Sequence, residues 1–203
     1  MTDTARADVA RAEGLARSAS AASPRSWLAH WAKADVLRAQ HRFEEAIPEY
    51  ETVLSLNHNL APALQGLADC KLWTGSIDEV IPIEEQAMRL NPRDPQIAVR
   101  YRRIGQVHLL QSRTDEAIRW LEKARSANPE LQGIHAFLAS AYALKGETDR
   151  GTAELAEARR QRGPGSYVSI ARLRAGFVGV QKIRDLYEAT YFAGLRKAGL
   201  PEE

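Results

Sequence analysis

The sequence predicts an all-α protein, a right-handed α-solenoid of antiparallel helix pairs with a capping helix at its C-terminal end. Hydrophobic residues make up 44% of the 203 residues and charged residues 27%, which is typical of a soluble globular protein. Alanine, leucine, arginine and glutamate are frequent whereas threonine, valine, phenylalanine and tyrosine are sparse, which favours helix over strand. Most telling are three similar segments, EEAIPEYETVLSLNH (44–58), DEVIPIEEQAMRLNP (78–92) and DEAIRWLEKARSANP (115–129).

Small residues follow the same period along the chain. Helices that pack closely need small side chains where their backbones approach each other. Successive members of each series are separated by 34, 37 and 34 residues, and the extra three residues fall in the proline-rich junction PRDPQI (92–97). The three series are Ala34, Ala68, Gly105 and Ala139; Ala46, Val80, Ala117 and Gly151; and Val53, Ala87, Ala124 and Ala158.

The period divides the chain into elements. Residues 1–26 keep the register one period earlier and are predicted to form the second helix of a degenerate repeat. Four repeats are predicted at 27–60, 61–97, 98–131 and 132–165, each with two helices separated by a polar break. Ser76 and Glu79 form a capping-box pattern at the start of one second helix. Residues 166–203 leave the period, and we expect a short helix, a turn near 176–179 and a longer helix that caps the array.

At these positions the sequence resembles the tetratricopeptide repeat family. The resemblance covers about four-fifths of the chain and rests on four repeats in register. It implies a non-catalytic scaffold that binds a protein or peptide partner in a concave groove lined by the first helix of each repeat. The matching residues are Ile104, Gly105, Ala117, Leu121, Ala124 and Pro129 in one repeat, and Leu138, Ala139, Tyr142, Gly146, Leu155 and Ala158 in the next.

The repeat register also predicts which side chains face this groove. Tryptophan and arginine are enriched at binding hot spots, and both occur among these side chains. The alternative for Trp31 and Trp73 is that they only pack between helices. The predicted groove residues are Trp31, Asp35, Arg38, Gln65, Asp69, Trp73, Arg102 and Gln106, continued by Leu109, Ala136, Ser140 and Leu144.

No catalytic, metal or cofactor site is predicted. The five histidines are scattered, and Cys70 has no neighbouring cysteine or histidine. Carboxylate pairs such as Asp115–Glu116 stand at the starts of second helices, where they favour the positive end of the helix dipole. The absence of a long apolar run and of a signal sequence, together with the single cysteine, predicts a cytoplasmic protein without a membrane span.

Two alternatives to a simple scaffold stay open. Together with the repeats, the ending YFAGLRKAGLPEE resembles the repeat segment of alphaproteobacterial signalling proteins. This resemblance implies the regulatory segment of a class III adenylate cyclase or of a winged-helix transcription regulator. The second alternative is nucleic-acid binding through the basic tail, which we do not favour; it would use Arg172, Arg174, Lys182, Arg184, Arg196 and Lys197. The sequence does not identify the partner or the oligomeric state.

Overall fold

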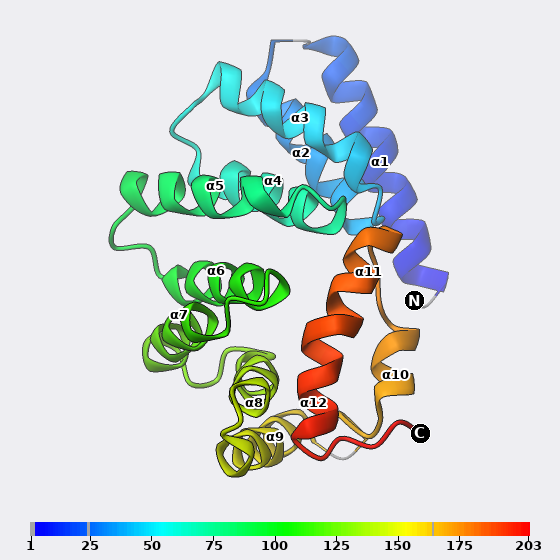
Figure 1. Cartoon of the computed structure of the whole chain (residues 1–203). Helices are drawn as coiled ribbons and strands as arrows, with labels where there is room; N and C mark the ends of the chain where they lie inside the picture. Colours follow the sequence, from blue (N-terminus) through cyan, green and yellow to red (C-terminus); the bar gives the residue numbers. More distant parts are fainter. Residues whose placement is uncertain (1–2, 24, 164) are drawn as a thin grey trace. The chain divides into compact units, whose positions relative to one another are not determined.

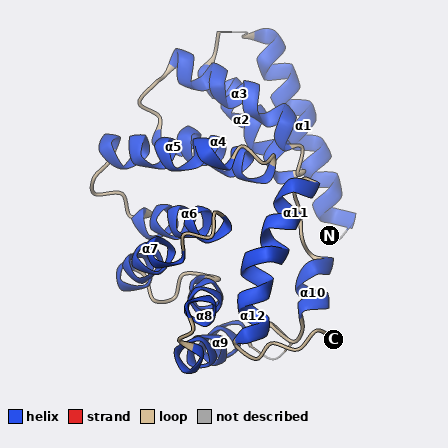
Figure 2. Ribbon diagram, in the orientation of Figure 1, coloured by secondary structure: helices blue, strands red, loops and turns tan. Residues whose placement is uncertain are grey.

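The computed structural model describes residues 3–23, 25–163 and 165–203. Residues 1, 2 and 24 of the predicted N-terminal segment, and residue 164, lie outside the described residues. Every regular element in the described ranges is a helix (Figure 2). The predicted all-α class with antiparallel helix pairs is therefore confirmed. The chain divides into two compact units, Met1–Asn91 and Pro92–Glu203, and each is described by itself.

The first unit contains a single helix followed by two antiparallel pairs (Figure 1). Helix α1 (Asp3–Ala22) packs against α2, as the predicted second helix of a degenerate repeat would. Each helix of the unit then packs against the next along the chain. The first pair is α2 (Trp27–Ala39) and α3 (Phe43–Leu56), and the second is α4 (Ala61–Trp73) and α5 (Ile77–Leu90).

The second unit contains two further pairs and the tail. Each predicted repeat holds one pair, although α6 begins one residue before the predicted repeat, at Ile97. The pairs are α6 (Ile97–Leu110) with α7 (Thr114–Ala127), and α8 (Ile134–Lys145) with α9 (Thr148–Arg162). The tail consists of α10 (Ile170–Ala175), α11 (Gln181–Tyr187), the π-helical segment η1 (Glu188–Phe192) and α12 (Ala193–Lys197).

The small residues of the repeat lie where the helices approach each other most closely. All twelve members of the three series are buried. A Cβ atom on Gly105 of α6 would stand 2.7 Å from Cγ of Leu121 on α7, too close for carbon atoms. A Cβ atom on Gly151 of α9 would stand 2.9 Å from the carbonyl oxygen of Ala139 on α8. These two glycines therefore permit a helix spacing that alanine would widen.

The helix starts follow the sequence only in part. Acidic residues occupy the first turns of α3, α5 and α7, where they meet the positive end of the helix dipole. Helix α5 begins directly after Ser76, but the Ser76 side chain makes no capping hydrogen bond, so the predicted capping box is wrong. Side-chain caps are formed by Ser26 at α2 and by Ser169 at α10, whose hydroxyl oxygen accepts from the Arg172 amide at 3.2 Å.

The tail lies on the first helices of its unit rather than only on the last pair. Segment η1 packs against α6 and α8, and α12 packs mainly against α8 and more lightly against α9 (Figure 1). The chain end is tied back to α10, because the Ile170 and Ala171 amides each donate to a carbonyl oxygen of residues 201–202 at 2.9 Å. The capping prediction accounts for the contacts with α8 and α9 but not for those with α6.

Candidate functional site

In the first unit, the predicted groove residues of α2 lie on one side of the helix. Leu28, Trp31, Asp35 and Arg38 are spaced by three or four residues and so share a face, which we call the α2 face. Leu28 is 56% exposed, and the other three are partly exposed. The ring of Trp31 stacks on that of Trp27 with centroids 6.2 Å apart. This stacking orients the Trp31 ring while part of it stays in contact with solvent.

A polar network holds Asp35 and Arg38 in place. The hydroxyl of the fully buried Tyr50 donates to Oδ1 of Asp35 at 2.5 Å, and it accepts from Nε of Arg38 at 2.9 Å. Arg38 also lies 3.4 Å from Asp35 and 3.5 Å from Asp69 of α4. Burial raises the pKa of the Tyr50 hydroxyl, and its hydrogen bond to Asp35 raises it further. The network therefore joins α2, α3 and α4 with a neutral tyrosine at its centre.

The predicted residues of α4 are partly buried. The ring of Trp73 stacks on that of Phe43, which is buried on α3, with centroids 6.4 Å apart and planes 26° apart. Trp73 thus packs between helices, the alternative that the sequence left open for it. Asp69 belongs to the polar network, and Gln65 is partly exposed one turn before it.

In the second unit, the tail covers the equivalent positions. Gln106 is only 2% exposed, and its amide donates to the Tyr187 hydroxyl of α11. Arg102, one turn earlier on α6, lies over the Phe137 ring at 5.9 Å. The sequence register placed both side chains on the groove, and the structure places Gln106 beneath the tail.

The tail also fits closely against α8. The Ser140 hydroxyl donates to the carbonyl oxygen of Thr190 at 3.5 Å, and a Cβ atom on Gly194 would stand 2.3 Å from Oγ of Ser140. The ring of Tyr191 packs on that of Phe137 at 4.8 Å. Fully burying one large apolar side chain stabilises a fold by ~1.5–3 kcal/mol. Because Ile183, Phe192 and Leu195 are buried as well, a partner would have to replace several such contributions to displace the tail.

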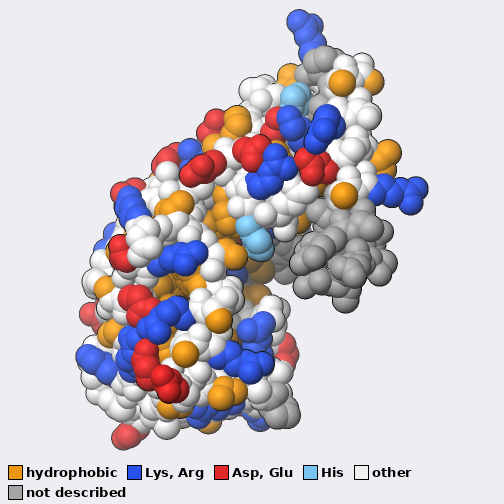
Figure 3. All heavy atoms as spheres, turned by 90° about the vertical axis from the view of Figure 1, so that its right-hand side faces the viewer, with side chains coloured by type: hydrophobic (Ala, Val, Ile, Leu, Met, Phe, Trp, Pro, Cys, Tyr) orange, Lys and Arg blue, Asp and Glu red, His pale blue; other side chains and the backbone are white. Residues whose placement is uncertain are grey.

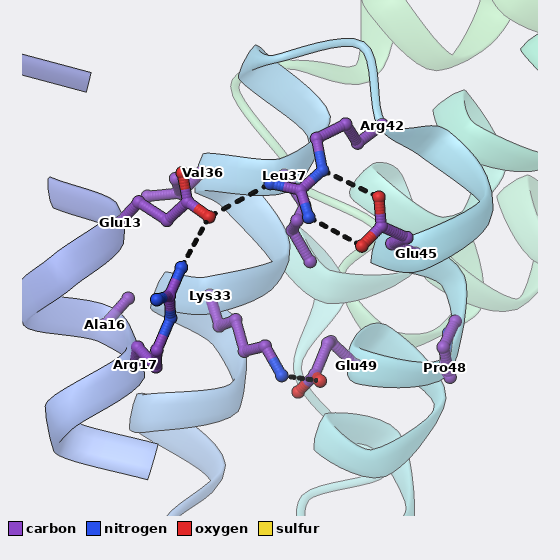
Figure 4. A pocket seen from close by; sticks show the side chains of 10 residues that line it. All are labelled: Glu13, Ala16, Arg17, Lys33, Val36, Leu37, Arg42, Glu45, Pro48 and Glu49. Carbon is purple, nitrogen blue, oxygen red and sulfur yellow. Dashed lines mark hydrogen bonds and ion pairs between the residues drawn. The ribbon is translucent and has the colours of Figure 1, made fainter. Parts of the chain in front are cut away.

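A charged pocket of about 370 Å³ lies between α1, α2 and α3 (Figure 4). Glu13 of α1 accepts from Arg17 and from Arg42, each at 3.0 Å, and Arg42 also pairs with Glu45 at 2.6 Å. Hydrogen bonds from Gln40 and Arg42 hold the pKa of the Glu13 carboxyl below its usual range. The three carboxylates and three cations of this pocket are paired with one another, so the pocket ties α1 to the first pair.

Metal-binding clusters and membrane-spanning helices were sought among the described residues. Among the described residues, no group of three or more histidine, cysteine, aspartate or glutamate side chains is placed to hold a metal ion. No helix in the described ranges is long and apolar enough to cross a membrane.

The antiparallel pairs and the periodic small residues define a helical repeat protein, and the comparisons agree. The tetratricopeptide repeat model matches residues 37–100, from the end of α2 into α6. No curated protein matches the sequence.

Solved structures of repeat proteins share the fold at low sequence identity. PilF of Pseudomonas aeruginosa is 17% identical with a TM-score of 0.70, over 97% of this chain and 86% of that one. A thermophilic TPR protein of Thermus thermophilus is 20% identical with a TM-score of 0.63, over 95% and 93% of the two chains. YrrB, described as a TPR protein with an unusual peptide-binding site, is 18% identical with a TM-score of 0.59, over 90% of each chain. At these identities the likeness establishes the fold alone.

Three features of the site were missed by reasoning from the sequence. The register gave the α2 face, but it could not show that Tyr50 of α3 would bridge Asp35 and Arg38. The same register could not place the tail on α6. Leu28 was overlooked although it stands three residues before Trp31, a spacing that could have found it.

Proposed function

We propose that this chain is a non-catalytic interaction scaffold that binds a protein or peptide partner through the α2 face of its first unit. The observation that carries the proposal is the combination of exposed Leu28 with partly exposed Trp31 and with a fixed charged group, Asp35 and Arg38. Apolar anchors beside oriented polar groups are the usual composition of an interface centre. The fold supports the proposal, because the TPR protein YrrB is described as having a peptide-binding site.

The α2 face suits a partner with a polar or charged residue next to an apolar one. Asp35 and Arg38 lie 3.4 Å apart and present one charge of each sign on this face. The side chains of Trp31 and Leu28 continue the face toward the start of α2. An amphipathic helix could present both kinds of side chain with a spacing of three or four residues.

The experiment compares two exposed leucines of the same unit. Leu28→Glu places a charge on the α2 face, whereas Leu15→Glu makes the same change on α1, where Leu15 is 64% exposed. We expect affinity capture from the native cell, followed by mass spectrometry, to lose specific partners with Leu28→Glu and to keep them with Leu15→Glu. Calorimetry with the purified partner then measures how much affinity the Leu28→Glu variant has lost. The proposal would be overturned if the original protein and the two variants captured the same partners.

The nucleic-acid alternative finds no support in the charge distribution. Arg174 and Arg196 of the basic tail are each paired with both Glu188 and Glu202, at N–O distances between 2.5 and 3.2 Å. Acidic and basic side chains are interspersed on the surface seen in Figure 3. Binding to phosphates requires cations that are not already neutralised. The regulatory-segment alternative and the cytoplasmic compartment stay predictions from the sequence.

A further inference from the structure

A second surface of the molecule has features that the proposed function does not use. An open cavity of about 900 Å³ lies on the first pair of the second unit. We call it the aromatic cavity, because Tyr101 on α6 and Trp120 on α7 line it. Its other lining side chains include Arg119, Glu122, Lys123 and Ser126, all on α7.

The repeat register shows that helix packing does not require the two aromatic rings. Tyr101 and Trp120 are nineteen residues apart, and the other three repeats have a pair of residues at the same positions. In the first and fourth repeats, Nδ1 of a histidine lies 2.6 Å from a glutamate oxygen, and the second repeat has two aliphatic residues. These pairs are His30 with Glu49, Leu64 with Ile83, and His135 with Glu154. The aromatic pair is thus particular to the third repeat among the four.

Both rings are only partly buried. Their centroids are 5.5 Å apart and their planes are inclined by 45°, so the rings do not cover each other face to face. Nζ of Lys123 lies 4.3 Å from the centre of the Trp120 ring. Large rings left in contact with water beside an open cavity form a surface on which a flat apolar group can pack.

The charges around the cavity favour an acidic ligand. The carboxylate of Glu122 accepts from the Tyr142 hydroxyl at 2.5 Å and pairs with Arg150 at 3.1 Å. Arg119 has a distant pairing with Glu116, at 3.5 Å, and is otherwise exposed. Within the part of the chain that the structure describes, Lys123 has no carboxylate partner. The cations of the cavity are therefore less neutralised than its carboxylate.

We propose that the aromatic cavity binds an extended acidic peptide that contains proline. Its proline rings pack on Tyr101 and Trp120, and its carboxylates pair with Lys123 and Arg119. A proline-rich segment is already extended in solution, so it loses little conformational entropy when it docks on aromatic side chains. A peptide fits better than a nucleic acid, because the cavity offers only two cations, Arg119 and Lys123, to a continuous phosphate backbone. This surface shares no residue with the α2 face, so the inference goes beyond the proposed function.

The test measures peptide binding to the full chain by fluorescence anisotropy. The probe is a fluorescein-labelled decapeptide of five Glu-Pro repeats. The double variant Tyr101→Leu with Trp120→Ile recreates the aliphatic pair of the second repeat, so it is expected to fold, and circular dichroism checks this. We expect it to weaken binding about thirtyfold, the effect of losing an aromatic hot spot. Lys123→Gln should weaken binding about fivefold, and Lys197→Gln on α12 should leave it unchanged.

Other probes decide the ligand class. Decapeptides of five Lys-Pro or five Glu-Ala repeats should bind at least tenfold more weakly than the Glu-Pro peptide. The proposal is overturned if the Glu-Pro peptide shows no binding at millimolar concentration, or if the folded double variant binds it as well as the original protein. It is also overturned if a ten-nucleotide thymidine oligomer or either control peptide binds equally well. Leu28→Glu should not change the Glu-Pro affinity, so this test and that of the α2 face can fail independently.

Discussion

Gly66 illustrates how one residue can position a functional group on a neighbouring helix. A Cβ atom at this position would stand 2.3–2.6 Å from three atoms of the Tyr50 ring and hydroxyl. The missing side chain therefore lets Tyr50 lie close to the backbone of α4, while its hydroxyl bridges Asp35 and Arg38. The α2 face depends on Gly66 although Gly66 does not belong to it.

We expect Gly66→Ala to lower the free energy of unfolding by about 1–3 kcal/mol. Tyr50 cannot move aside without breaking its hydrogen bonds, so the added methyl group overpacks the contact. Gly14→Ala in α1 is the matched control, because, outside its own stretch of helix, no described atom lies within 4 Å of its Cβ position. That change should raise stability by about 0.4–1 kcal/mol, since alanine restricts the unfolded chain more than glycine does. Urea denaturation measures both, and equal stability of the two variants would contradict this account.

At the residue scale the sequence predicts burial better than it predicts contacts. The burial of the twelve small residues follows from their spacing, because the same packing of two helices recurs in every repeat. The contact of Tyr50 with Gly66 occurs in one repeat only, so periodicity holds no information about it. The aromatic cavity is similar: the register identifies Tyr101 and Trp120 as equivalent to the other pairs, but their exposure depends on the neighbouring side chains.

The tail shows the corresponding limit at the scale of elements. A short helix, a turn and a longer helix are predicted by the pattern and are found. Which surface the longer helix covers depends on fit in three dimensions, namely Gly194 against Ser140 and Tyr187 against Gln106. The repeat register identified Gln106 as a groove residue because it describes the array without its tail. The π-helical segment from Glu188 to Phe192 is likewise absent from the pattern.

We expect Gly194→Val to loosen the tail. The valine Cβ would stand 2.3 Å from Oγ and 2.4 Å from the carbonyl oxygen of Ser140, so α12 would have to move away from α8. Amide hydrogen exchange over residues 181–197 should become faster, and proteases should cleave this segment sooner. Ala189→Val in the same tail is the control, because Ala189 is exposed. If Ala189→Val accelerated exchange as much as Gly194→Val, helix propensity rather than docking would be responsible.

At the scale of the whole molecule, paired carboxylates make stability depend on pH. Hydrogen bonds from neighbouring cationic or amide side chains hold the pKa of seven glutamates below its usual range. One of them is Glu49, where burial raises the pKa but hydrogen bonds from Lys33 and His30 lower it by more. The other six are Glu13, Glu45, Glu147, Glu157, Glu188 and Glu202. A carboxyl group with a lowered pKa in the folded state binds its proton more readily in the unfolded state.

We expect the contribution of these seven glutamates to the free energy of unfolding to be steady between pH 7 and about pH 5, since they are ionised in both states there. It should fall once the pH drops below about 4.3, the unfolded value for glutamate, and continue to fall until the folded groups are protonated. Because all seven are at least partly exposed, 0.5 M NaCl should reduce the difference between pH 7 and pH 3. Urea denaturation across this range measures it, and greater stability at pH 3 than at pH 7 would refute the expectation.

The placement of the C-terminal helix also bears on how large a ligand this protein can hold. In an ordinary array, each added helix pair lengthens the surface available to a bound chain. Here the first helices of the last two pairs are covered by a segment of their own polypeptide, so at most two of the four pairs offer the surface of their first helix to an outside molecule. A ligand length estimated by counting repeats would be about twice too long. Short peptides are therefore the ones to screen first.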